Sequence, residues 1–237
     1  MIFLIAVVAV LTGIFYLYST FHIKFEIHTI QKDSIVRPIK IIQISDLHGR
    51  TSFVNGQLSD LINVTNKILV VLGNYEREKI KHFKKEQYDI EPLLKEFEEM
   101  YNLMFLVNSS IVDDSNGQTL VFYGFDNSIY GLEAYEDQPE YASADFTTLL
   151  SHSPNIIKYI DEHHIKYDLL LTGHTHGNQV NVPFLRGIRN AYKNYHIGMK
   201  INNEKHFYIS RGLGTARILL RVNSKPEITI INLESTR

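Results

Sequence analysis

Four short apolar runs in this chain each end in a polar cluster that contains aspartate, asparagine or histidine. The runs are rich in isoleucine, valine and leucine, which is typical of strands buried on both faces of a sheet. They occupy residues 39–44, 67–72, 147–150 and 168–172. The polar residues that follow them are Asp46, His48, Asn74, His152, His174 and His176. Because ligands bind at the carboxyl ends of strands in α/β proteins, we expect these side chains to meet at one edge of a sheet.

Each of these six side chains can bind a divalent first-row metal ion, since imidazole suits zinc, iron and manganese, and carboxylate and amide oxygens suit harder ions. Taken singly, each has a commoner role, because an Asp or Asn after a strand usually caps a turn and a lone His is usually a hydrogen-bonded polar residue. In Asp46-Leu47-His48 the alternation of an extended chain points both polar side chains the same way. A glycine on each side of His174-Thr175-His176 lets the backbone approach an ion closely. Taken together, the six residues therefore predict a metal site.

The composition excludes several other classes of protein. The chain has 237 residues and no cysteine, which rules out disulfide scaffolds, cysteine nucleophiles, zinc fingers and iron–sulfur sites. Lys and Arg number 24 against 26 Asp and Glu, so no bulk positive field is available to hold nucleic acid. With 44% hydrophobic and 21% charged residues the chain has the profile of an ordinary globular protein. We therefore expect no nucleic-acid partner, and any metal must sit on His, Asp, Glu or Asn.

The first residues form an apolar run that differs from the rest of the chain. Residues 2–18 carry no charge and no proline, and the run is at the short end of what spans a hydrocarbon core as a helix. A cleaved signal peptide is disfavoured, because no Lys or Arg precedes the run and no small-residue cleavage site follows it. A buried core helix is the other alternative. We expect a single-pass membrane anchor over residues 1–20, a connector over 21–38 and one domain over 39–237, with the nearest positive charges favouring a cytoplasmic domain.

The remainder of the chain alternates between helical and extended patterns, which predicts an α/β fold. Helices are expected over residues 58–64, 77–85, 91–100 and 155–162. Further strands are expected over residues 104–107, 119–124, 207–210 and 227–233. A tyrosine-rich stretch over residues 123–141 is open to a partner-binding role, although such stretches more often cover a site or lie on a surface.

The polar clusters occur in motifs that resemble those of the calcineurin-like metallophosphoesterases, and within them the membrane-anchored bacterial type. The similarity covers roughly residues 39–233, and the Gly-His-Thr-His piece is the most specific part of it. The matching pieces are Ser45-Asp46-Leu47-His48, Gly73-Asn74-Tyr75-Glu76, residues 150–154 (LSHSP), residues 171–180 (LTGHTHGNQV), residues 209–214 (ISRGLG) and Pro226-Glu227-Ile228.

This resemblance implies a four-layer α/β/β/α sandwich with a two-metal site among the loops at the strand ends. It also implies hydrolysis of a phosphomonoester or phosphodiester by in-line attack of a metal-bound hydroxide. Two divalent ions are expected, from among Mn, Fe and Zn. The resemblance assigns one ion to Asp46, His48 and His176, and the other to Asn74, His152 and His174. It assigns no further catalytic residue.

Two features depart from the family pattern. The family has a strand ending in Gly-Asp between its first two motifs, and this Asp bridges the metals. The interval between Asp46 and Gly73 is too short for it, so we expect a central strand-helix unit to be missing. Asp60, the only acid in that interval, is the one candidate to replace the bridging Asp, although it lies in a segment expected to be helical. Tyr75 stands where the family has the His of Gly-Asn-His, and tyrosine is a weaker acid than imidazolium at neutral pH.

Two hypotheses of function follow. The first is a membrane-anchored, metal-dependent phosphoesterase, for which the anchor suggests a lipid-linked or cell-envelope phosphoester. The second is a catalytically impaired relative that acts as a metal-binding or structural membrane protein. Without a bridging carboxylate two divalent ions repel each other, so the site is expected to hold one ion well and the second poorly. Asp46, His48 and His176 form a two-His-one-carboxylate set, which suffices for a single Fe, Mn or Zn.

Overall fold

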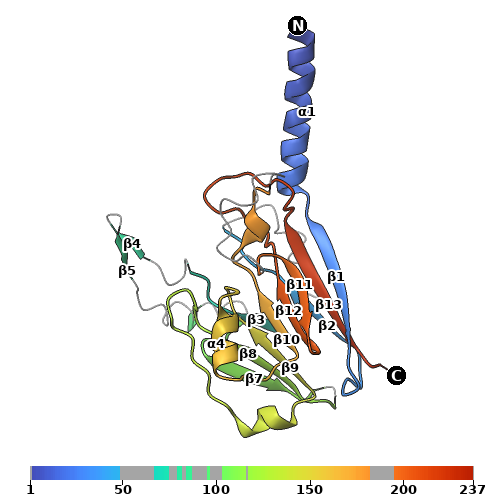
Figure 1. Cartoon of the computed structure of the whole chain (residues 1–237), viewed down its shortest axis with the longest axis vertical. Helices are drawn as coiled ribbons and strands as arrows, with labels where there is room; N and C mark the ends of the chain where they lie inside the picture. Colours follow the sequence, from blue (N-terminus) through green and yellow to red (C-terminus); the bar gives the residue numbers. More distant parts are fainter. Residues whose placement is uncertain are drawn as a thin grey trace.

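A six-stranded sheet forms the centre of the protein in the computed structural model (Figure 1). The structure describes residues 2–48, 67–74, 79–81, 84–86, 95–96, 103–115, 117–181 and 195–236. The order of the strands is β11-β12-β10-β9-β8-β7. Their bounds are Ser109–Asp113 for β7, Leu120–Gly124 for β8, Phe146–Leu150 for β9, Leu169–Thr172 for β10, Gly198–Asn202 for β11 and Lys205–Ile209 for β12. The four inner strands run parallel, and β7 and β11 run antiparallel to them at the two edges.

A second sheet has three strands in the order β1-β13-β2. Strand β1 (Lys24–Gln31) runs parallel to β13 (Glu227–Glu234), and β2 (Ile39–Gln43) runs antiparallel to it. Two smaller pairs complete the described strands. They are β3 (Ile68–Val70) with β6 (Leu103–Phe105), which are parallel, and β4 (Lys79–Lys81) with β5 (Lys84–Glu86), which are antiparallel.

The two large sheets pack against each other through an apolar core. Leu120, Phe146 and Leu171 come from the six-stranded sheet, and Ile231 and Leu233 come from β13. These side chains are at most a few percent exposed, so the space between the sheets is filled. This is the sheet-on-sheet contact expected of a sandwich, and the predicted mixed α/β class is confirmed.

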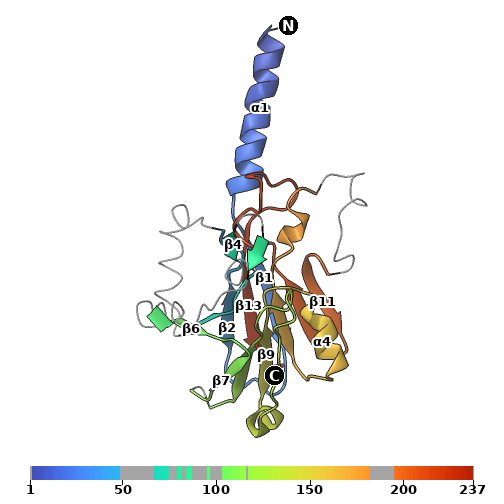
Figure 2. The same cartoon turned by 90° about the vertical axis from the view of Figure 1, so that its left-hand side faces the viewer.

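The opposite face of the six-stranded sheet is covered by helix α4 (Ile156–Glu162), which lies to the right of β9 in Figure 2. Ile156 and Ile160 of this helix pack on Leu149 and Leu170 of the sheet. The tyrosine-rich stretch, which includes the short helix η1 (Pro139–Ser143), joins the same cluster, with Tyr135 and Tyr141 packed against it. In the described part of the chain this gives three layers of the four expected, one helical and two of strands.

Most of the strands expected from the sequence are present within one or two residues of their predicted ends, and the helix expected over 155–162 is α4. The helix expected over 77–85 is wrong where the structure describes it, since residues 79–81 and 84–86 form the hairpin strands β4 and β5. This interval has few apolar residues, and helices in proteins owe most of their stability to a buried apolar face. The helix expected over 58–64 and Asp60 lie outside the described residues, as does Tyr75, and the helix expected over 91–100 is described only at residues 95 and 96.

Helix α1 (Ile2–Phe21) stands away from the sheets and meets them only at its last turns (Figure 1). Tyr16 donates a hydrogen bond from its hydroxyl to the carbonyl of Leu219 at 2.8 Å, and the N–H of Arg221 donates to the Thr20 hydroxyl at 3.1 Å. Thr20 is fully buried. The end of the predicted anchor is thus packed against the domain.

The predicted membrane-spanning anchor over residues 1–20 is not confirmed. A search of the described residues finds no helix with the combined length and apolar character that a membrane crossing requires. Residues 21–38, expected as a connector, contain β1, which forms a full-length ladder with β13. The connector is therefore a structural part of the three-stranded sheet.

The position of β1 predicts which N-terminal truncations the fold tolerates. A chain that starts at residue 39 loses β1 and exposes the edge of β13, so we expect it to aggregate or to melt well below the full chain. A chain that starts at residue 16 keeps β1 and the packed end of α1, and we expect it to stay folded and monodisperse. Thermal melting by circular dichroism and size-exclusion chromatography check this. Equal stability of the two shortened chains would contradict the assignment of β1 to the core sheet.

Candidate metal centre

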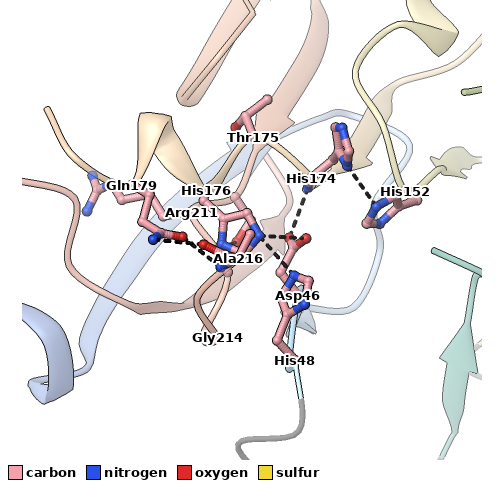
Figure 3. Close-up of polar contacts among 12 residues, drawn as sticks. Asp46, His48, His152, His174, Thr175, His176, Gln179, Arg211, Gly214 and Ala216 are labelled. Carbon is pink, nitrogen blue, oxygen red and sulfur yellow. Dashed lines mark hydrogen bonds and ion pairs between the residues drawn. The ribbon is translucent and has the colours of Figure 1, made fainter. Parts of the chain in front are cut away.

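The six predicted ligands lie together at the carboxyl ends of four strands. Asp46 and His48 follow β2, and Asn74 follows β3. His152 follows β9, while His174 and His176 follow β10. Figure 3 shows the aspartate and the four histidines turned toward one another. Strands that are distant in the sequence thus deliver these side chains to one place, as the strand-end pattern predicts.

Asp46, His48 and His176 form a group that we call the first triad. One ligand atom from each lies within 4.8 Å of the others. The Nε2 atoms of His48 and His176 are 3.0 Å apart, and Asp46 Oδ1 lies 3.6 Å from His176 Nε2. The Asp46 side chain is only 1% exposed. Two imidazoles and one carboxylate at these separations fit a single divalent metal ion.

Asn74, His152 and His174 form a second group, the second triad. His152 Nε2 lies 3.0 Å from Asn74 Oδ1 and 3.0 Å from His174 Nδ1. All three donors are electrically neutral when the rings are unprotonated, so this group attracts a cation less strongly than the first triad does. The grouping follows the assignment implied by the motifs, and the role of each residue as a ligand stays a prediction.

Asp46 connects the two triads. The backbone N–H of His174, a second-triad residue, donates to Asp46 Oδ2 at 2.9 Å, while Asp46 Oδ1 faces His176. Over the described ranges no second carboxylate joins the group of candidate ligands. A bridging acid of the kind typical of the family is therefore not found among these residues.

The backbone of the candidate ligands is left-handed at four positions. The φ angles are +53° at Asp46, +45° at His48, +69° at His174 and +51° at His176. Non-glycine residues rarely adopt this region because it costs about 1–2 kcal/mol each. Strand β2 ends at Gln43, so Asp46 and His48 lie in a strained turn that brings their side chains together. The prediction that the alternation of an extended chain aligns these two side chains is therefore wrong.

Glycines give the Asp46 carboxylate its space. A Cβ on Gly173 would clash with Asp46 Oδ2, and one on Gly212 would lie 2.5 Å from Asp46 Cβ. Gly173, one of the two glycines expected to let the backbone approach an ion, lies directly against the Asp46 carboxylate. Gly212 belongs to the 209–214 motif, so the packing explains part of that motif.

Burial keeps the rings of His152, His174 and His176 neutral. It lowers the pKa of His174 to about 4, with His152 adding to the effect and Asp46 opposing it. The pKa of His176 also falls to about 4 through burial, which Asp46 opposes and the Arg221 guanidinium reinforces. Burial alone would raise the pKa of Asp46, but His176, His152 and the N–H of His174 together hold it below its usual value. Neutral imidazoles and an ionised carboxylate are the forms that bind metal ions, so these residues fit such an ion.

Sequence reasoning missed Arg221, whose guanidinium lies 3.1 Å from Nδ1 of His176. It lies between the motif pieces at residues 209–214 and 226–228, and this position was the only signal in the sequence. Since a guanidinium only donates, Nδ1 accepts, and a neutral ring then carries its proton on Nε2. A metal ion at Nε2 would therefore require the ring proton to move to Nδ1 and the contact with Arg221 to open.

The lowered pKa values of the histidines predict the pH dependence of the metal-free protein. Between about pH 6.5 and pH 4 the unfolded chain binds protons on His174 and His176, whereas the folded chain does not. The free energy of unfolding therefore falls as the pH drops through this window. Chemical denaturation at several pH values measures the slope. We expect His174→Asn, which removes one of the two titrating rings, to flatten it. Identical slopes in wild type and His174→Asn would contradict the assignment.

Comparison with known proteins agrees with the motifs. The model of the family described as calcineurin-like phosphoesterase matches residues 53–178, more than half of the chain. This range includes Asn74, His152, His174 and His176 and begins after Asp46 and His48. No solved structure matches the chain.

Several bacterial proteins are similar to this chain. YkuE of Bacillus subtilis, named an uncharacterized metallophosphoesterase, is 34% identical over 125 residues, which cover 52% of this chain and 43% of YkuE. The phosphodiesterase YaeI of Escherichia coli is 34% identical over 87 residues, 36% of this chain and 31% of YaeI. In both cases the matched part spans less than half of the relative.

A longer match is to an uncharacterized metallophosphoesterase of Aquifex aeolicus, 22% identical over 273 residues that cover 96% of this chain and 98% of the relative. Because the alignment is longer than the 237 residues of this chain, the relative has residues without a counterpart here. The matched family range and the order of the motifs show that the chain belongs to the calcineurin-like phosphoesterase family.

Proposed function

We propose that this protein is a metal-dependent hydrolase of a phosphomonoester or phosphodiester that uses a metal-activated water. The observation that carries the proposal is the convergence of six nitrogen and oxygen donors from four strand ends into two adjacent triads. Membership of the family supports the same general activity. The name of the E. coli relative YaeI, a phosphodiesterase, supports a phosphodiester as the first substrate to test.

The first triad would hold the more tightly bound ion, because it contains the carboxylate. The second triad would hold the other ion through neutral donors. A bound divalent ion lowers the pKa of its water toward neutrality and offsets the charge that builds on the phosphoryl oxygens. The protein holds the donor atoms in place through buried packing, the His174 N–H on Asp46 and the left-handed turns. Mn, Fe and Zn all suit this donor set.

A specific observation favours the second hypothesis, a catalytically impaired relative that still binds metal. The described residues supply one carboxylate to the two triads, and two divalent ions close together repel unless an anion lies between them. Tyr75, outside the described residues, also replaces the family's histidine. The lipid-linked or cell-envelope substrate expected from a membrane anchor is not part of this proposal, because the span on which it rested is not found among the described residues.

Hydrolysis of a chromogenic bis-aryl phosphate by the metal-stripped and Mn-reloaded full chain tests the proposal. We expect turnover that requires Mn and that falls more than about 100-fold in His176→Ala and in His152→Ala, since even residues that only support metal ligands contribute 10–100-fold. His163→Ala removes an exposed histidine outside the site and should keep wild-type activity.

The outcomes separate the hypotheses. Mn-dependent turnover that both triad variants lose supports the hydrolase. Tight Mn binding without turnover on monoester and diester substrates favours the impaired relative. Turnover that is unaffected by either triad substitution would overturn the assignment of the site.

A further inference from the structure

Arg221 is a fully buried arginine directly behind the first triad. Its Nε donates to the carbonyl of Gly214 at 3.0 Å, and its Nη1 donates to the carbonyl of Ser224 at 2.9 Å. Nη2 lies 2.8 Å from the carbonyl of Arg211 and 3.1 Å from that of Gly212. Burying a charged side chain is costly and seldom adds net stability even when its partners are good. The burial of Arg221 therefore indicates a role other than stability alone.

The guanidinium reaches a candidate metal ligand. Its Nη2 lies 3.1 Å from Nδ1 of His176, on the side of the ring that faces away from the triad. The other nitrogen of the ring, Nε2, is thereby directed at His48 and Asp46. A metal-bound neutral imidazole carries its proton on the nitrogen away from the metal, and that N–H cannot accept from a guanidinium, so this contact belongs to the metal-free form of the ring.

The same guanidinium also holds the segment that supports Asp46. The carbonyls of Gly212 and Gly214 accept from Arg221, while the N–H of Gly214 donates to the carbonyl of Asp46 at 2.6 Å. The neighbouring N–H of Leu213 donates to the carbonyl of Ser45 at 3.0 Å. Arg221 therefore connects His176 on one side with the backbone of Asp46 on the other.

We propose that Arg221 is a positioning residue of the metal centre. It fixes the 212–214 segment, whose N–H groups hold the backbone of Ser45 and Asp46, and so sets the position of the Asp46 carboxylate in the first triad. This inference rests on the proposed function, in that the first triad is taken to bind a metal ion. This positioning role explains why the residue is an arginine. Its rigid guanidinium can donate to several carbonyls and a ring nitrogen at the same time.

Arg211 offers a matched control on the same loop. Arg211 follows β12, and its guanidinium lies 2.9 Å from the carboxylate of Glu26 in β1 and 3.2 Å from that of Glu227 in β13. These ion pairs connect the end of β12 with the three-stranded sheet. These ion pairs involve no member of either triad. Loss of this side chain should lower stability without moving a ligand.

The test compares Arg221→Met, Arg221→Lys and Arg211→Met in the full chain. The free energy of unfolding is measured without metal, and Mn affinity is measured by calorimetry, with the visible spectrum of bound Co as a second report on the ligand geometry. We expect both methionine variants to be less stable than wild type. We expect Arg221→Met alone to weaken Mn binding, by about 10–100-fold, and to change the Co spectrum. Arg221→Lys, which keeps the charge but lacks the fork, should fall between Arg221→Met and wild type.

Three outcomes overturn the inference in distinguishable ways. Wild-type Mn affinity in Arg221→Met, or in Arg221→Lys if the methionine variant does not fold, shows that Arg221 does not position the ligands. An equal loss of affinity in Arg211→Met shows a general effect of destabilisation. If the wild type does not bind Mn, the assignment of the metal centre is wrong, and both the proposed function and this inference fail.

Discussion

The buried carboxylate of Asp46 is the group around which the site is organised. One of its oxygens faces His176, and the other accepts the N–H of His174, so a single side chain orders both members of the histidine pair. Two glycines, Gly173 and Gly212, leave room for it. A carboxylate so deeply buried is costly unless its neighbours stabilise the charge, and here the neighbours are the candidate ligands. The strained turns at Asp46 and His176 persist because the surrounding sheets hold them.

The grouping of the candidate ligands could be predicted from the sequence because it depends on a simple property of parallel strands. Their carboxyl ends lie at one edge, so polar residues that follow β9 and β10 must be neighbours. Asp46 and His48 follow the antiparallel strand β2 of the other sheet, and the packing of the two sheets brings them to the same place.

Other features could not be predicted because they arise from contacts between distant parts of the chain. Strand β1 pairs with β13, at the opposite end of the sequence, and nothing in its local pattern distinguishes it from a connector. The left-handed turns follow from packing more than from residue preference, because even Asp and His, which adopt positive φ more often than most non-glycine residues, do so uncommonly. Arg221 carries no motif of its own, and only the fold places it behind His176.

The number of carboxylates at the site decides how many metal ions it can hold tightly. The described residues supply one carboxylate to two groups of donors, so the first triad should dominate metal binding. Anomalous X-ray diffraction from crystals of the full chain grown with Mn would locate the ion without reference to activity. We expect a strong peak bounded by Asp46, His48 and His176, with a weaker peak or none at Asn74, His152 and His174. No peak at the first triad, or a stronger peak elsewhere, would contradict this expectation.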